Sequence, residues 1–131
     1  MPGVQPQRIS GHSPYEPVFG FSRAVVVGDR VLVAGTAPVP AGGGPPPSGP
    51  YGQARLCLEL IGGALLKAGT SFDHVIRTRM YITDASHCSE VARAHGEVFA
   101  EVRPAATAVI VASLLDPAWL VEIEAEAVLP G

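Results

Sequence analysis

The feature that most constrains the fold is a strict alternation of apolar and acidic residues near the C-terminus. Residues 121–127 read VEIEAEA, which predicts a strand over residues 121–129. Successive side chains of a strand point to opposite faces, so this strand has one apolar face and one face of three glutamates. Such a strand belongs in a sheet with one face buried in a core and the other face free of that core. The chain must therefore supply further strands to pair with it.

Four other segments have the composition of strands. Residues 23–27 and 30–35 are β-branched runs, and Gly28-Asp29 between them suits a two-residue hairpin turn. Residues 75–83 alternate, with Ile76 among the residues assigned to the core face, and residues 106–112 form another strand. The sequence thus predicts an antiparallel hairpin followed by three more strands.

Two amphipathic helices are predicted between these strands. The first begins near Pro50 and ends at Gly69, and the second runs from a cap at Asp84 to residue 102. Each has a single apolar stripe and each connects two strands, so both must cover the same face of the sheet. We therefore predict an α/β (α+β) fold: one domain over residues 1–131, with a mixed sheet, two helices on one face and the order ββαβαββ.

Two segments lack any periodic pattern. We expect residues 1–10 to be flexible. Residues 38–50 read PVPAGGGPPPSGP and offer no side chains for a core, so we interpret them as a surface loop. Two interpretations of this loop are open, a tolerated insertion or a functional lid.

Composition excludes several classes of function. The net charge is −3 and no basic run occurs, which argues against a nucleic-acid partner. No apolar stretch approaches the roughly 20 residues that span a bilayer, and no signal sequence is evident, so we expect a cytoplasmic protein without membrane contact. Cys57 and Cys88 lack metal or redox spacing and are expected to be buried, inert thiols. No metal site and no cofactor motif is found.

Several stretches of the chain together are similar to a known family. They are GFSRAVVVGDRVLVAGT at 20–36, TRMYITD at 78–84, RPAATAVIVASL at 103–114 and VEIEAEA at 121–127. The chain resembles the RidA/YjgF family of reactive-intermediate deaminases over nearly its whole length from Gly20. The resemblance implies a chorismate-mutase-like fold and a homotrimer with small-molecule clefts at its subunit interfaces. It also implies cofactor-free hydrolysis of imines and enamines to 2-keto acids and ammonia; older names call relatives endoribonucleases.

Four positions depart from the pattern of the family's deaminases. Ala106 stands where they carry an arginine that binds the substrate carboxylate through two parallel hydrogen bonds, and alanine has no such donors. Ala108 replaces a frequent cysteine, Ile110 a frequent glutamate and Phe21 a frequent tyrosine. These residues would line the cleft that the resemblance implies. We therefore do not expect a standard 2-iminobutanoate deaminase.

Two charged residues remain as candidates for that cleft. Glu124 matches the family glutamate that positions the attacking water, although a solvated strand charge is an equal alternative. Arg79, on the polar face of its strand, is a candidate for the lost positive charge, but an ion pair with one of the glutamates is the favoured interpretation.

The remaining candidates have simpler alternatives. Arg23 follows Phe21 near the expected cleft, yet a surface or interface arginine is the more frequent case. Trp119 is a candidate for the cleft rim or a packing residue, and Tyr81 is expected to pack at an interface. His95 lies in an apolar helical stripe and is interpreted as a core histidine.

Two functional hypotheses follow. The first is a divergent RidA-like trimer that acts without a cofactor on a small reactive metabolite, as a hydrolase or deaminase or as a tautomerase. The second is a non-catalytic trimer that binds a small molecule or regulates, since several cleft positions have lost their polar groups. Endoribonuclease activity is less favoured because the chain is acidic.

Overall fold

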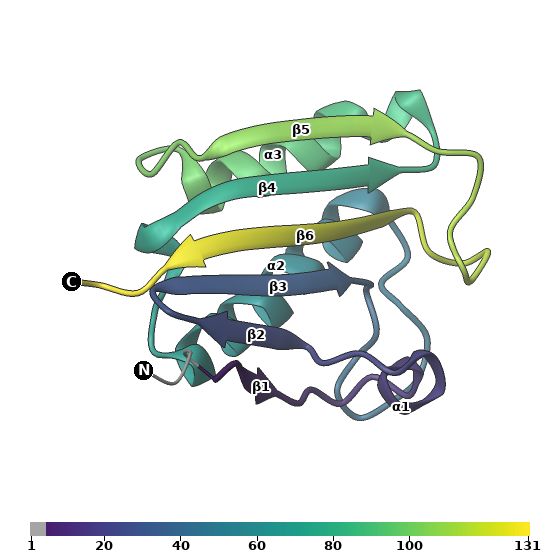
Figure 1. Ribbon diagram of the computed structural model, residues 1–131. Coiled ribbons are helices and arrows are strands. Elements are labelled where there is room, and N and C mark those ends of the chain that lie inside the picture. The colour runs from purple at the N-terminus through teal and green to yellow at the C-terminus, as the bar shows by residue number, and fades with distance from the viewer. Residues whose placement is uncertain (1–4) are drawn as a thin grey trace.

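The structure of the protein, a computed structural model, describes residues 5–131 and contains one mixed β-sheet. Its strands lie in the order β1-β2-β3-β6-β4-β5 (Figure 1). Only β4 and β5 are parallel among the described strand pairs; every other neighbouring pair is antiparallel. The strands are β1 (Gln7–Ile9), β2 (Ala24–Val27), β3 (Arg30–Thr36), β4 (Val75–Ile82), β5 (Ala105–Ile110) and β6 (Val121–Val128).

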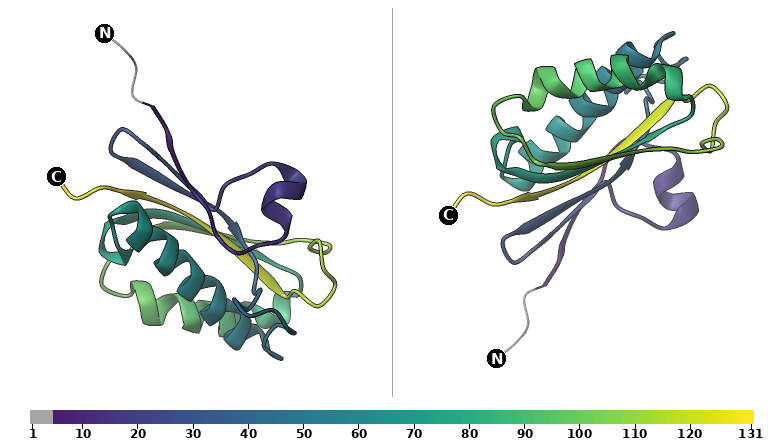
Figure 2. Two further views of the ribbon diagram at one scale, coloured as in Figure 1. Left: turned by 90° about the horizontal axis from the view of Figure 1, so that it is seen from below. Right: turned by 90° about the horizontal axis from the view of Figure 1, so that it is seen from above.

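Two long helices cover one face of this sheet. They are α2 (Pro50–Ala68) and α3 (Cys88–Phe99), which lie side by side on the same side of the strands in both views of Figure 2. The apolar residues of β6 face them, since Val121, Ile123 and Ala127 are fully buried. The mixed sheet with two helices on one face is therefore confirmed. A short helix, α1 (Tyr15–Phe19), lies beyond the end of β3 (Figure 1).

The ends of the long helices follow local chemistry. Helix α2 has proline in its first turn and ends at Gly69, whose left-handed φ of 94° suits a glycine. Asp84 caps a 3-10 turn, η2 (Ala85–His87), by accepting a hydrogen bond of 2.8 Å from the Ser86 backbone N–H. A second 3-10 turn, η1 (Phe72–His74), precedes β4. Helix α3 itself begins at Cys88 and ends at Phe99, so it is shorter than the predicted helix at both ends.

The two central glycines of α2 have different surroundings. A Cβ placed on Gly62 would lie 2.7 Å from Cζ of Phe72, so this glycine permits close packing against η1. A Cβ placed on Gly63 would meet no atom within 4 Å. Close packing therefore explains Gly62 and not Gly63.

Two details of the sequence prediction are wrong. Residues 7–9 lie inside the stretch expected to be flexible, but they form β1 and pair with β2; the same expectation for residues 1–4 lies outside the described residues. Ile76 was assigned to the core face but is 40% exposed, while Val75 is 3% exposed. The register shift between Val75 and Arg77, typical of a β-bulge, breaks the alternation at that point.

Candidate functional site

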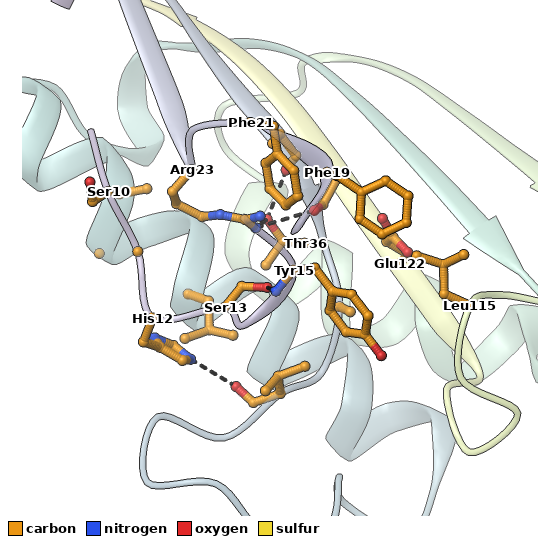
Figure 3. Close-up of a pocket in the computed structure, with 18 of the residues that line it drawn as sticks. Ser10, His12, Ser13, Tyr15, Phe19, Phe21, Arg23, Thr36, Leu115 and Glu122 are labelled. Carbon is orange, nitrogen blue, oxygen red and sulfur yellow. Dashed lines mark hydrogen bonds between the residues drawn. The ribbon is translucent and has the colours of Figure 1, made fainter. Parts of the chain in front are cut away.

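A cavity of about 440 Å³ opens at the end of the sheet where β3 ends and β6 begins. Its walls come from the segment 10–23, from α2 and from the turn before β6, so residues distant in sequence meet there (Figure 3). Ala37 and Val39 also line the cavity. Val39 lies at the start of the loop predicted over residues 38–50, and Ala37 is the residue before that loop. His12 lies 3.1 Å from the carbonyl oxygen of Val39 and links that loop to the N-terminal segment. The volume lies in the range of small-molecule sites, roughly 300–1,000 Å³.

Arg23, just before β2, is the buried cation of this cavity. Its Nη1 donates hydrogen bonds to the carbonyl oxygen of Gly35 at 3.2 Å and to Oγ1 of Thr36 at 2.7 Å. Burial lowers the pKa of Arg23, while the charges of Glu16 and Glu122 act in the opposite direction. Arginine keeps its proton in proteins, so the cavity contains a desolvated guanidinium.

Glu122, the first glutamate of β6, lines the cavity with its carboxyl group, as does Glu59 of α2. Glu122 lies over Gly35, and a Cβ at Gly35 would overlap its Oε2 atom. Burial raises the pKa of Glu122 above its ordinary value, although the charge of Arg23 lowers it. Among residues 5–131, no hydrogen bond or ion pair engages this carboxyl group. Its carboxyl group is therefore left without a protein partner among these residues.

Aromatic side chains form much of the remaining wall. Tyr15 packs edge-on against Trp119 with a centroid separation of 5.7 Å and lies 6.1 Å from Phe19. The guanidinium of Arg23 lies 5.4 Å from the ring centroid of Phe21. Trp119 is buried, whereas Phe19 is exposed at the mouth. The site thus combines an apolar wall with the charges of Arg23 and Glu122, as small-molecule sites commonly do, and Glu59 and Lys67 of α2 also line it.

Three residues of the sequence prediction meet in this cavity. They are Phe21, Arg23 and Trp119. Arg23 was expected most often to be a surface or interface residue, but it is buried. Trp119 packs against Tyr15 and also lines the cavity.

Glu124 and Arg79 lie elsewhere, on the sheet face that the helices leave open. The hydroxyl of Tyr81 donates a short hydrogen bond to Glu124. Nη1 of Arg79 lies 3.9 Å from Glu124 and 3.7 Å from Glu126. The structure therefore supports the ion-pair interpretation of Arg79. The role of Glu124 in a cleft between subunits stays a prediction; in the cavity within one chain, β6 places Glu122 instead.

The three altered positions on β5 also lie outside the cavity. Ala106, Ala108 and Ile110 are exposed on the edge strand. Ala106 pairs with Thr78 and Ala108 with Met80, both buried, so these residues point toward the helix side of the sheet. Within one chain they form no site with Glu122.

Three other residues named from the sequence, His95, Cys57 and Cys88, lie away from the cavity. Nε2 of His95 lies 2.8 Å from Oγ1 of Thr78, as expected of a core histidine, and burial lowers its pKa. Cys57 is buried, and burial raises the pKa of its thiol. Cys88 is only partly buried, so the expectation of burial is wrong in degree. None of these residues lines the cavity.

The sequence reasoning missed Glu122 as the cavity carboxyl. Alternation places Glu122, Glu124 and Glu126 on one face and does not distinguish them. The distinguishing signal is a glycine: the register pairs Thr36 with Ile123, which brings Gly35 beside Glu122. A glycine before the end of a strand is a known sign of close approach, but its partner is visible only in the fold.

The described part of the chain contains neither a metal-binding cluster nor a membrane-spanning helix. Over residues 5–131, no group of three or more His, Cys, Asp or Glu side chains is placed to hold a metal ion. None of the helices found in that range is long and apolar enough to cross a membrane.

The fold and cavity define a class: an α+β protein with a cavity of small-molecule size beside its sheet. Residues 11–129 match the family model described as Endoribonuclease L-PSP. A crystal structure from Mycobacterium tuberculosis, described as a member of the YjgF/YER057c/UK114 family, is 38% identical, with a TM-score of 0.87 over 95% of this chain and 100% of that one. The chain therefore belongs to the L-PSP endoribonuclease family, also called the YjgF/RidA family.

Two relatives have informative descriptions. A Capra hircus 2-iminobutanoate/2-iminopropanoate deaminase is 33% identical over 82% of this chain and 79% of its own length. Escherichia coli TdcF, solved with bound serine, is 28% identical, with a TM-score of 0.80 over 99% of this chain and 100% of that one. The first of these relatives is thus named for a deaminase, and the second was solved with an amino acid bound.

Proposed function

We propose that the protein is a cofactor-free hydrolase of small, reactive imines or enamines and that Glu122 handles the proton of the attacking water. The observation that carries this proposal is the unpaired carboxyl group of Glu122, whose pKa is raised by burial. A general base works best when its pKa is near the working pH, and burial moves a carboxyl group toward that range. The name of the goat relative, 2-iminobutanoate/2-iminopropanoate deaminase, supports imine hydrolysis as the reaction class.

The chemistry of such a site is balanced with water as the only co-reactant. Ionised Glu122 accepts a proton from a water molecule as the water oxygen bonds to the imine carbon. Glu122 returns that proton to the nitrogen, which gives a carbinolamine. It then carries the hydroxyl proton to the nitrogen as the carbon–nitrogen bond breaks, so that the carbonyl group forms and ammonia leaves. The product is a ketone or 2-keto acid, and Glu122 is again ionised.

The assembly is part of the proposal. We propose a homotrimer with the small-molecule ligand bound near subunit boundaries. The support is an open sheet face and an exposed edge: Leu32 is 44% exposed, Val109 is 41% exposed and all of β5 is accessible in one chain. Exposed apolar residues on a sheet commonly mark a subunit contact.

Ala106 still argues against the standard substrate, 2-iminobutanoate. Its methyl group cannot hold a carboxylate, and β5 brings it to no other side chain of the cavity within one chain. We expect an imine whose remaining groups suit the aromatic wall.

The test is 2-keto acid release from imines that an amino-acid oxidase generates in the assay. We expect the wild type to accelerate release and Glu122→Gln to lower kcat/KM by about a hundredfold. Glu124→Gln is the matched control, because it makes the same change two positions along the same face. Loss of activity in Glu124→Gln with retention in Glu122→Gln would assign the reaction to the other glutamate.

A second function, ligand binding without catalysis, is favoured by one observation. The aromatic wall around Glu122 includes Phe21, which offers no hydroxyl to orient water. Wild-type protein that binds a carboxylic acid but accelerates no imine would establish this second function. A ribonuclease remains the least favoured function, since the chain is acidic.

A further inference from the structure

We infer that Arg23 is the anion anchor of the cavity and that its ligand carries a carboxylate on a large apolar body. The reaction class in this inference rests on the proposed function, whereas the binding of a carboxylate by Arg23 does not. It assigns to this chain a carboxylate-binding group other than the arginine that Ala106 has replaced. The opposite charge, at Glu122, then faces the nitrogen end of the same ligand.

The guanidinium of Arg23 has more hydrogen-bond donors than the described part of the chain uses. A guanidinium has five N–H groups in a fixed fork. Nη1 of Arg23 donates to the carbonyl oxygen of Gly35 and to Oγ1 of Thr36. Nε is buried without a partner, and Nη2 donates to no protein atom among residues 5–131. Nε and Nη2 together form one edge of the fork, which suits two carboxylate oxygens.

The nearest internal carboxylate does not satisfy that edge. Oε2 of Glu16 lies 3.9 Å from Nε of Arg23, which is an ion-pair contact but lies beyond hydrogen-bond distance. Glu16 instead accepts hydrogen bonds from the backbone N–H groups of Gly11 at 3.0 Å and Ser13 at 3.3 Å. A buried cation with unmatched donors is costly, and an anion arriving from the cavity would remove that cost.

The walls of the cavity suit a ligand with a large apolar body. Phe19, Phe21, Tyr15 and Trp119 present rings to the cavity, and Gly63 of α2 adds no side chain where a Cβ would meet no atom. The volume of about 440 Å³ exceeds what a three- or four-carbon acid fills. Each buried methylene strengthens binding by about 0.8 kcal/mol, which is about fourfold. Large apolar acids should therefore bind more tightly than short ones.

The binding test uses three probes with the intact wild-type protein in isothermal titration calorimetry. They are 3-phenylpropanoate, its uncharged isostere 3-phenylpropanamide, and butanoate. We expect 3-phenylpropanoate to bind at least about tenfold more tightly than the amide, as one charge-assisted hydrogen bond predicts, and more tightly than butanoate. Equal affinity for the acid and its amide would overturn the anchor, and tighter binding of butanoate would overturn the apolar body.

Variants assign the preference to a residue. Arg23→Gln should lose the preference for the acid over the amide, whereas Arg23→Lys should keep part of it because the charge remains without the fork. Unchanged affinity for the amide shows that Arg23→Gln is folded. Arg8→Gln, on the exposed face of β1, is the matched control. Loss of the preference in Lys67→Gln but not in Arg23→Gln would make Lys67 the anchor and refute the inference.

A turnover measurement separates this inference from the proposed function. Imines generated from phenylalanine and leucine should be hydrolysed with higher kcat/KM than the imine from alanine. Binding of 3-phenylpropanoate without turnover of any imine would refute the hydrolase and leave the anchor standing. Turnover of the alanine imine alone, with no binding of 3-phenylpropanoate, would refute the anchor and leave the hydrolase standing.

Discussion

Glu122 and Glu124 lie two positions apart on one face of β6, and their surroundings give them different chemistry. Glu124 is engaged by Tyr81 and Arg79, which hold it in a polar cluster. Glu122 lies over a glycine, among apolar walls, with a buried guanidinium as its nearest cation. A desolvated, unpaired carboxyl group is the more suitable proton carrier.

The raised pKa of Glu122 predicts a pH-dependent stability. In the unfolded chain this carboxyl group ionises near its ordinary pKa of 4.5, but in the folded chain it holds its proton to higher pH. The folded state therefore binds more protons above that pH, and the free energy of unfolding falls as pH rises through the folded pKa. Glu122→Gln should raise the melting temperature relative to wild type more at pH 7.5 than at pH 4.

Thermal unfolding of both proteins at the two pH values checks this expectation. Comparing the difference between the proteins cancels the contributions of other titrating groups, such as His95. A larger gain at pH 4 than at pH 7.5 would mean that Glu122 is stabilised in its ionised form. Catalysis should show the reverse trend, with kcat/KM falling as pH drops through the pKa of Glu122.

Gly35 offers a test of how Glu122 is positioned. Gly35→Ala would place a methyl group over Oε2 of Glu122 and displace the carboxyl group, which lies at the end of a flexible side chain. We expect kcat/KM to fall about tenfold or more, as misplacement of a reacting group commonly causes, with little change in melting temperature. Gly42→Ala, where a Cβ meets no atom within 4 Å, is the control. Full activity in Gly35→Ala would show that Glu122 needs no fixed position.

At the scale of elements, α2 contains a matched pair of glycine substitutions. Gly63→Ala adds a methyl group in open space and should stabilise the protein by about 1 kcal/mol through helix propensity. Gly62→Ala adds the same group 2.7 Å from Cζ of Phe72, so repulsion should cancel that gain and leave the protein less stable than wild type. Urea unfolding measures both. Equal stability of the two variants would show that Phe72 moves without cost.

Periodicity and turn chemistry were sufficient to predict most elements of the fold. The alternation in β6, the hairpin at Gly28 and the proline and glycine ends of α2 each follow from local chemistry. The errors have tertiary causes. The bulge after Val75 breaks an alternation, and β1 is ordered by pairing with β2 rather than by its own composition. Local sequence carries little of either signal.

The site was less predictable than the fold. Arg23, Phe21 and Trp119 were named because they lie near the expected cleft, and the fold brings them together. Glu122 could not be separated from Glu124, because only the pairing of β3 with β6 places a glycine beneath one of them.

At the scale of the whole molecule, the open sheet face predicts the assembly. Leu32 and Val109 leave apolar area exposed beside the ion-paired cluster of Arg79, which a second and third copy would cover. We expect multi-angle light scattering to give the mass of three chains at micromolar concentration. A single-chain mass that persists at higher concentration would exclude the homotrimer and leave the cavity as a site within one chain.

We propose that the cavity between Arg23 and Glu122 is the working site of the molecule. The most direct measurement is a crystal structure of Glu122→Gln with 3-phenylpropanoate, since this variant should bind without turning over a substrate. We expect the carboxylate of 3-phenylpropanoate to lie within hydrogen-bond distance of the Arg23 guanidinium, with its phenyl ring against Phe21 or Trp119. A ligand bound instead along β5, at Ala106 and Ala108 and away from Arg23, would contradict this proposal.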